Sequence, residues 1–176
     1  PNGVAGGADG TLQGGTAWVV STLPVLWVDD DGPGDPGPGD PTASDPLEDG
    51  SLEHPYDALQ EAVDACPSAG WVVLRDGTYA GEGNRDVRFS NRPTAVGSEH
   101  GPESTIIDCQ AQTSGLGSAR GFYLPSGGTA AIRIQGLTVR NSFMDSAIYA
   151  VGEWSLTVVD CSFLQNRAGE EGGAID

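Results

Sequence analysis

The side chains best placed to do chemistry are two aspartates that each follow a short aliphatic run. Asp108 comes after a pair of isoleucines and Asp160 after a pair of valines, and Arg133 and Arg140 lie between them in the chain. Paired carboxylates cleave glycosidic bonds when they lie about 5 to 9 Å apart, with one as the acid and the other as the base or nucleophile. These four residues are the catalytic candidates, and no Ser-His-Asp, phosphate-loop or zinc-ligand pattern accompanies them.

A second group of carboxylates could hold a metal ion. Asp29, Asp31 and Asp35 open a stretch, ending near Asp49, that is rich in Asp, Gly and Pro. Oxygen ligands at such spacing, with Gly32 allowing a sharp turn, partly resemble the loops that wrap Ca²⁺. The EF-hand spacing is not reproduced, because no glutamate stands at the twelfth position and prolines intrude. The composition predicts a surface loop, with calcium binding and a plain solvated acidic loop as the two hypotheses.

The charge balance excludes several classes of partner. The chain has 25 acidic residues against 8 basic ones, all of them arginine, and a net charge of −17. Nucleic-acid phosphates need a basic face, so we expect no nucleic-acid partner, and anionic membrane surfaces are disfavoured for the same reason. The apolar segment from Ala17 to Val28 is broken by Pro24 and is shorter than the roughly 20 residues of a membrane span. An odd count of three cysteines argues against a closed disulfide framework.

The candidate residues lie in segments that repeat along the chain. The run Val158 to Cys161 echoes Ile106 to Cys109, and Ile134 to Leu137 falls between them, 24 residues before the last copy. Likewise Ser146 to Ile148 precedes Gly173 to Ile175 by 27 residues. Such a period, carried by short runs of Val, Ile, Thr and Phe between polar residues and glycine, predicts an all-β solenoid. The economical architecture is a parallel β-helix, whose coils stack and bury an aliphatic ladder.

This register decides whether the candidate aspartates can work as a pair. Asp108 and Asp160 occupy equivalent positions two coils apart, which puts them about 10 Å from each other at roughly 4.8 Å per coil. That separation exceeds the range for glycoside hydrolysis, so no catalytic residue is assigned. Asn141 and Asn166, where strands end, are expected to turn the chain in the left-handed region or to stack between coils.

The elements that must position these residues are a helix and a series of strands. Pro55 opens the helix, since proline is preorganised at the first helical position, and apolar residues follow at helical spacing until Pro67. The continuous apolar run Trp71 to Leu74 is expected to be a strand buried in a parallel sheet. Residues 1–16 are a Gly-rich leader, 17–50 hold two short strands and the acidic loop, 51–70 hold the helix that caps the N-terminal end, and 71–176 form the coils. Because a repeat ends at Ile175, we expect the coils to continue in a longer protein.

Several of these segments resemble a known family. Phe163 to Asn166, followed by Gly172 to Ile175, resembles the repeat Phe-x-x-Asn…Gly-Gly-Ala-Ile of polymorphic outer-membrane-type surface proteins, within the pectin-lyase-like, right-handed parallel β-helix group. Upstream, Pro55 to Ala65, Trp71 to Tyr79 and Ser98 to Cys109 resemble the opening of bacterial β-helix proteins of that group. The resemblance implies a right-handed solenoid, and the enzymes of the group use acidic residues, often with Ca²⁺ or an arginine base.

The resemblance covers roughly residues 27 to 176 and implies function less directly than fold, because this fold hosts enzymes, adhesins and spacers alike. We expect a secreted or cell-surface, non-catalytic protein of bacterial type with a structural, adhesive or glycan-contacting role. Its partners would be glycans or other surface proteins. One alternative is a polysaccharide lyase or glycoside hydrolase of the same group. Another is a fibre-forming subunit that associates with itself end to end through an open C-terminal coil.

Overall fold

Short aliphatic runs bounded by glycine or polar residues form the strands of this protein. The computed structural model describes residues 23–30, 47–111, 119–143, 146–169 and 173–176. In these residues the strands are β1 (Val25–Val28), β2 (Gly70–Leu74), β3 (Gly77–Ala80), β4 (Val87–Arg88), β5 (Thr94–Ser98), β6 (Thr105–Asp108), β7 (Phe122–Gly128), β8 (Ala131–Gln135), β9 (Thr138–Arg140), β10 (Ile148–Gly152), β11 (Ser155–Val159) and β12 (Ser162–Leu164). The same residues contain one helix, α1 (Leu59–Ala65).

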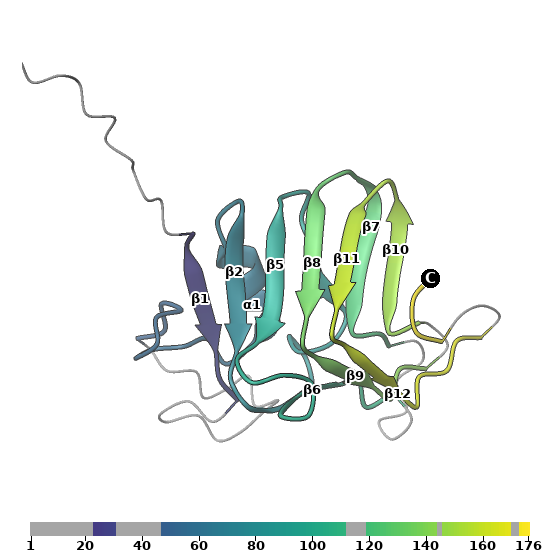
Figure 1. The fold of residues 1–176 in the computed structure, drawn as a ribbon, viewed down its shortest axis with the longest axis horizontal. Helices are drawn as coiled ribbons and strands as arrows, with labels where there is room; N and C mark the ends of the chain where they lie inside the picture. The colour runs from purple at the N-terminus through teal and green to yellow at the C-terminus, as the bar shows by residue number, and fades with distance from the viewer. Residues whose placement is uncertain (1–22, 31–46, 112–118, 144–145, 170–172) are drawn as a thin grey trace, which may run out of the picture.

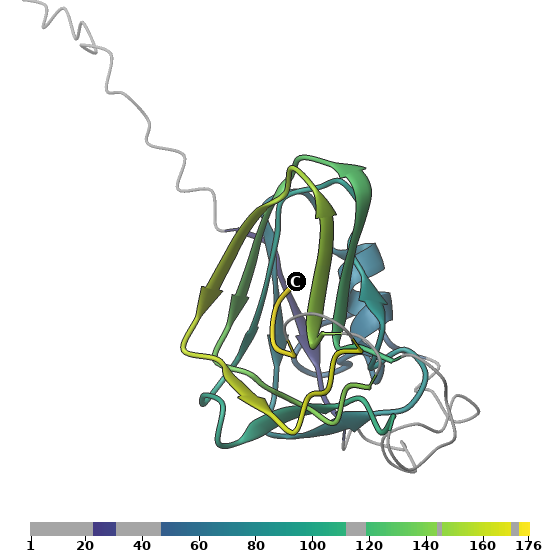
Figure 2. The same ribbon diagram turned by 90° about the vertical axis from the view of Figure 1, so that its right-hand side faces the viewer.

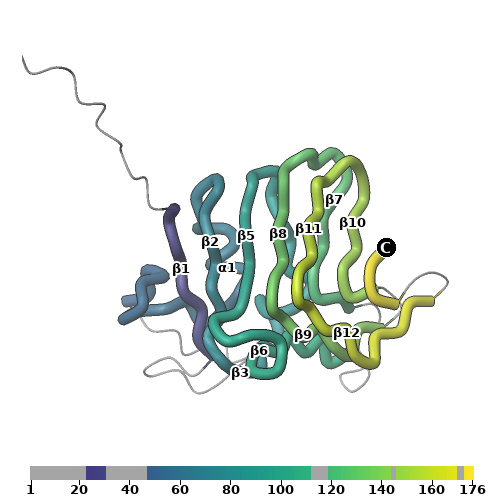
Figure 3. Tube along the Cα trace, in the orientation of Figure 1, coloured from purple at the N-terminus to yellow at the C-terminus, as the bar shows by residue number. Residues whose placement is uncertain are grey.

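Every paired strand runs parallel to its neighbour, and the strands form three sheets. Sheet A has the order β1-β2-β5-β8-β11, sheet B the order β3-β6-β9-β12 and sheet C the order β4-β7-β10. From β2 onward the chain passes from sheet A to B to C and returns to A. Sheet A faces the viewer in Figure 1, the tube in Figure 3 follows the successive passages, and Figure 2 shows the three sheets around a common interior. The predicted all-β, parallel architecture with one helix is confirmed at this level.

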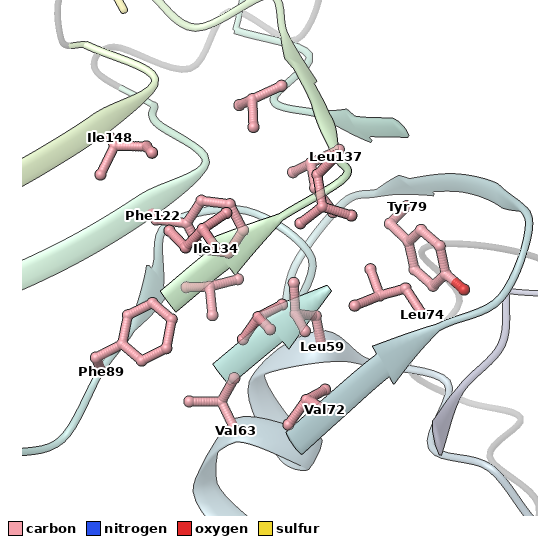
Figure 4. Close-up of a cluster of buried hydrophobic side chains, with 14 of the residues drawn as sticks. Leu59, Val63, Val72, Leu74, Tyr79, Phe89, Phe122, Ile134, Leu137 and Ile148 are labelled. Carbon is pink, nitrogen blue, oxygen red and sulfur yellow. The ribbon is translucent and has the colours of Figure 1, made fainter. Parts of the chain in front are cut away.

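Strand residues alternate between this interior and the outside. One inward row crosses all of sheet A and consists of Leu26, Val72, Val96, Ile134 and Val158. Phe122 of sheet C and Ile107 of sheet B are fully buried as well. In Figure 4, Phe122 and Ile134 lie close together within the same apolar cluster. Removal of this apolar surface from water is the main stabilising contribution to the fold.

Helix α1 packs on the first strands and begins later than its sequence pattern predicts. Its buried residues are Leu59, Ala62 and Val63, and it contacts β1, β2 and β4. The prediction that the helix starts at Pro55 is wrong, because Tyr56 instead forms a parallel bridge with Val28. The main chain before Leu59 is therefore extended, and the covering of the first strands starts one turn later than expected.

The helix also completes the hydrogen bonding of strands beside it. The side chain of Gln60 accepts from the Arg88 N–H at 2.7 Å and donates to the Arg88 carbonyl at 3.1 Å. These two bonds satisfy main-chain groups of β4, which is the edge strand of sheet C. The Asn84 side chain in turn accepts from the Leu59 N–H at 2.8 Å, a capping bond that Ala58 cannot provide.

The predicted roles of the asparagines at strand ends are confirmed, one role for each residue. Asn141 adopts the left-handed region with φ of 60°. In the next passage that conformation belongs to Gln165, with φ of 56°, one residue earlier than predicted. Asn166 stacks between passages, because its side chain accepts from the Ser142 N–H at 3.0 Å and donates to the Val139 carbonyl at 2.8 Å.

The repeat register is right for two pairs of segments and wrong for the third. Val158 pairs with Ile134, and Ile148 forms a bridge with Ile175, as predicted. Asp108, however, lies in sheet B opposite Arg140, whereas Asp160 follows β11 of sheet A. The two aspartates are therefore not at equivalent positions. The three cysteines are free, in line with the absence of a closed disulfide framework.

Candidate functional sites

The first pair of catalytic candidates, Asp108 and Arg140, forms an ion pair on sheet B. Arg140 Nε donates to Asp108 Oδ2 at 2.8 Å. Asp108 Oδ1 also accepts from the Asn141 side chain at 2.9 Å and from the Gln110 N–H at 3.0 Å. Burial alone would raise the pKa of Asp108, but these hydrogen bonds and the Arg140 charge outweigh it and lower that pKa below its ordinary value. The carboxylate is held ionised by its partners, which suits a structural role better than that of a general acid.

Of the other two catalytic candidates, Arg133 belongs to sheet A and Asp160 directly follows its last strand. Asp160 stands at the corner between β11 and β12 with φ of 49°, opposite a glycine that also has positive φ, Gly136. Arg133 lies on the outer side of β8, where its Nε donates to Gln135 Oε1 at 3.0 Å. Asp160 therefore serves to turn the chain. The four catalytic candidates do not come together on one sheet.

The predicted calcium ligands are described only in part. Asp29 is buried directly after β1, and its Oδ2 accepts from Arg75 Nη1 at 2.5 Å. Its neighbour Asp30 is also buried and accepts a backbone hydrogen bond from β3 at 2.6 Å. These two carboxylates secure the corner between β2 and β3. Asp31 and Asp35 lie outside the described residues, so calcium binding by the acidic loop stays a prediction.

A carboxylate group that the sequence did not reveal gathers at the start of α1. It consists of Glu48, Asp57 and Glu61, each of which offers an oxygen within 4.8 Å of the others. Asp57 lies just before α1 and Glu61 lies in the first turn of the helix. Glu48 comes from the preceding segment and is joined to them because its Oε1 accepts from the Asp57 N–H at 3.2 Å. Nothing in the local sequence of Glu48 indicates this contact.

Burial and the neighbouring charge raise the pKa of two of these acids, Glu48 and Glu61. Burial, followed by the charges of Asp57 and Glu61, raises the pKa of Glu48 to about 7. Burial and the Asp57 charge raise the pKa of Glu61 as well. Near neutral pH the group is therefore partly protonated, and its three oxygen donors are of the hard type that Ca²⁺ and Mg²⁺ prefer.

The outer face of sheet A carries an apolar hollow of about 200 Å³ around Trp71. One outward row across four neighbouring strands supplies much of its lining, namely Trp71, Ala95, Arg133 and Thr157. The indole extends over β5, since a Cβ on Gly97 would lie 3.3 Å from Trp71 Cζ3. The expectation that the Trp71 strand is buried on both sides is wrong for this residue, because it points outward and is half-buried.

A second hollow, of about 310 Å³, lies at the corner between sheets A and B and is mostly charged. Its lining residues are Asp29, Arg75, Asp76, Glu99 and His100. His100 Nδ1 lies 3.0 Å from Asp76 Oδ1, and the two side chains are 60% and 53% exposed. An ion pair with this much exposure to solvent contributes little to stability. Asp29, the buried carboxylate in its lining, already accepts a hydrogen bond from Arg75.

Comparison with known proteins found no matching family model, curated protein or solved structure. Among the described residues, no helix has the length and apolar character that crossing a bilayer requires.

Proposed function

We propose that this chain is a right-handed parallel β-helix of a secreted or cell-surface protein that contacts glycans without cleaving them. The ordered return of the chain from sheet A through B and C to A supports the solenoid. The strong preference of parallel crossover connections for one hand supports the right-handed sense. The glycan surface is the outer face of sheet A.

The observation that carries this proposal is the position of the Trp71 indole over the small residues of β5. Ala95 and Gly97 leave room for the ring to lie across the strand beside an open hollow. The face of an aromatic ring carries partial negative charge and attracts the C–H groups of a sugar. Arg133, on the next strand, supplies hydrogen-bond donors for sugar hydroxyls. Apolar packing with a few polar groups at its edge is the usual composition of a small-molecule binding site.

The same face is a poor candidate for catalysis. Arg133 is on sheet A and Asp160 in the turn after it, whereas the Asp108 carboxylate is on sheet B and occupied by three donors. Glycoside hydrolysis needs two carboxylates that face one bond, one of them protonated at working pH. We therefore favour glycan contact over the alternative of a lyase or hydrolase.

Binding of soluble oligosaccharides tests the proposal. Cello-, manno- and galacturono-oligosaccharides are titrated calorimetrically into the wild-type chain and into Trp71→Ala. We expect at least one of them to bind, and Trp71→Ala to weaken it by about tenfold or more, as truncation of a central aromatic contact does. For the neutral cello- and manno-oligosaccharides, Tyr149→Ala on sheet C is the matched aromatic control and should leave the affinity unchanged.

Two further measurements separate glycan contact from catalysis. Asp108→Asn and Asp160→Asn should bind the same oligosaccharide as tightly as the wild type. The purified chain should release no new reducing or unsaturated ends from the corresponding polysaccharide. Cleavage that either substitution abolishes would contradict the non-catalytic proposal. Binding that is not weakened by Trp71→Ala would show that the outer face of sheet A is not the glycan surface.

A further inference from the structure

The outer face of sheet A carries a second indole near the Trp71 hollow. Leu26 and Val28 pack toward the interior, so the alternation of the strand turns Trp27 of β1 outward. The register places Trp27 opposite Val73, two residues from Trp71 on the neighbouring strand β2. The strand spacing and the rise per residue then put the main chains of Trp27 and Trp71 about 8 Å apart on one face. Figure 1 shows β1 and β2 side by side at one end of sheet A.

The indoles of Trp27 and Trp71 differ from that of Trp154, which is used by the fold. Trp154 Nε1 donates to the Pro125 carbonyl at 2.8 Å, and its ring packs against the buried core. Trp27 and Trp71 are half-buried and are not among the side chains that pack against that core. Within the part of the chain that the structure describes, neither of their indole N–H groups has a hydrogen-bond partner, and the two rings do not stack on each other. Each indole therefore offers a ring surface and a donor to a ligand.

No carboxylate stands in the two outward rows that hold these indoles. The rows are Val25, Trp71, Ala95, Arg133 and Thr157 in one, and Trp27, Val73, Gly97, Gln135 and Val159 in the other. On a chain with 25 acidic residues, these acid-free rows are a distinct part of the surface. Their remaining polar groups are mainly donors, because Gln135 Oε1 already accepts from Arg133 Nε. A ligand for this face must supply acceptors and apolar surface, which a sugar does through its oxygens and its C–H groups.

The contact groups follow one another across the strands of sheet A. The strand order β1-β2-β5-β8 brings first Trp27, then the Trp71 indole over β5, and then Arg133. Three strand spacings separate β1 from β8, which is about 14 Å. A single sugar ring cannot extend over that distance, whereas a short linear chain of sugars can. The arrangement therefore suits a ligand several sugars long, lying across the strands.

We propose that Trp27 forms a second stacking subsite, so that the ligand of sheet A is a segment of a linear polysaccharide that lies across the strands. The inference rests on the proposed glycan contact at Trp71 and adds the length and the direction of the bound chain. One sugar packs on Trp71 beside the hollow, and Trp27 and Arg133 contact sugars on opposite sides of it. Affinity should therefore increase with the number of sugars until the chain covers both indoles.

Calorimetric titration of neutral cello- and manno-oligosaccharides, from the disaccharide to the hexasaccharide, into the full chain tests the proposal. For a series that binds, we expect the wild-type affinity to rise about tenfold or more over this range, the effect of one further aromatic contact. Trp27→Ala should bind the disaccharide as the wild type does but lose most of that gain, whereas Trp71→Ala should weaken every length. Trp27→Phe keeps an aromatic face and should retain part of the gain. Tyr149→Ala, on sheet C, is the matched control and should show the full gain.

Two results would overturn the second subsite and leave the glycan contact at Trp71 intact. One is a wild-type affinity that does not increase with length. The other is a Trp27→Ala variant that keeps the whole gain or loses affinity equally for every length. If no oligosaccharide bound to the wild type, the proposed function and this inference would fail together, and an apolar protein partner would be the better occupant of the face. Because the main-chain bonds of Trp27 to Gly50 and Tyr56 do not use its side chain, these variants should fold, and circular dichroism checks that they do.

Discussion

The first and last passages of the chain through the sheets use similar side chains but bury them differently. Val72 and Val158 belong to the same inward row of sheet A, yet Val72 is fully buried and Val158 is half-buried. In sheet B, Tyr79 at one end of a row is fully buried, whereas Phe163 at the other end is half-buried. Strand β2 lies between β1 and β5 with α1 packed on it, while the only named strand paired with β11 is β8.

This difference shows that burial depends on the neighbours of a passage more than on its own residues. In a stack of repeats, each unit gains most of its stability from contacts with the units on both sides. The first passage has such contacts because Gln60 and Asn84 join α1 to it. The same type of substitution should therefore be more harmful near α1 than in β11 or β12.

Two glycines give the largest expected effects. A Cβ on Gly77 would overlap the buried Asp30 carboxylate, and a Cβ on Gly128 would overlap the Trp154 indole. Displacing Asp30 also removes the acceptor of the Thr78 N–H, so Gly77→Ala should lower the free energy of unfolding by about 3 to 5 kcal/mol. Trp154 is only half-buried, so Gly128→Ala should cost less, about 1 to 3 kcal/mol. Urea unfolding measures both losses of unfolding free energy. A larger loss for Gly128→Ala than for Gly77→Ala would contradict the expected order.

The two valines of the inward row isolate the effect of burial at constant chemistry. Val72→Ala removes fully buried methyl groups and should cost about 2 to 3 kcal/mol. Val158→Ala removes groups that are already in part solvated, and about 1 kcal/mol is expected. Val96→Ala, in the middle of the row and fully buried, is the control and should resemble Val72→Ala. Equal losses for Val72→Ala and Val158→Ala would show that the position in the row does not matter.

The sequence predicted the architecture better than the register. Alternation and turn residues placed the strands, and the equivalence of Ile148 and Ile175 followed from their common Ala-Ile context. The alignment of Asp108 with Asp160 failed because every sheet presents an aliphatic inward row, so an Ile-Ile-Asp run in sheet B looks like a Val-Val-Asp run in sheet A. Similar local pattern does not determine which sheet a strand joins.

The candidate sites were harder to predict than the fold. The carboxylate group depends on Glu48, which meets Asp57 only because the intervening chain turns back. Trp71 belongs to an apolar run whose pattern does not show that one side faces solvent. Its exposure depends on which residues occupy the neighbouring strands, information that a single segment does not contain.

A smaller effect is expected where α1 satisfies the edge of β4. Gln60→Ala removes both side-chain bonds to Arg88, and because they are exposed we expect a loss of about 1 kcal/mol. Gln60→Glu keeps the acceptor for the Arg88 N–H and loses only the donor, so it should retain part of the stability. Hydrogen exchange of the Arg88 amide reports the same contact directly. Unchanged protection of that amide in Gln60→Ala would show that helix and strand are joined by packing alone.

The smallest expected effect is a dependence on pH that arises at the α1 end. The folded pKa of Glu48, about 7, lies above its ordinary value of 4.5, so the folded chain binds this proton more tightly than the unfolded chain. The resulting stabilisation is fully present below pH 4.5 and is lost as the pH rises through 7. Asp108 acts in the opposite sense, because its folded pKa is lowered and its contribution is lost only as the pH falls below its ordinary value of 3.8. Between about pH 3.8 and pH 7, the titration of Glu48 should therefore dominate the change of stability with pH.

Thermal unfolding between pH 5 and pH 8 can therefore test whether the pH dependence of stability arises at the α1 end. We expect the wild-type Tm to fall over that range, and Glu48→Gln, which has no ionisable proton, to flatten the dependence. EDTA must be present, since a divalent cation bound by Glu48, Asp57 and Glu61 would offset their repulsion at high pH. Glu153→Gln is the control, because this exposed glutamate of the last passage lies away from the group. If Glu153→Gln flattened the dependence as much as Glu48→Gln, the loss of stability would come from the general charge of the chain, and the carboxylates at the start of α1 would have no special part in it.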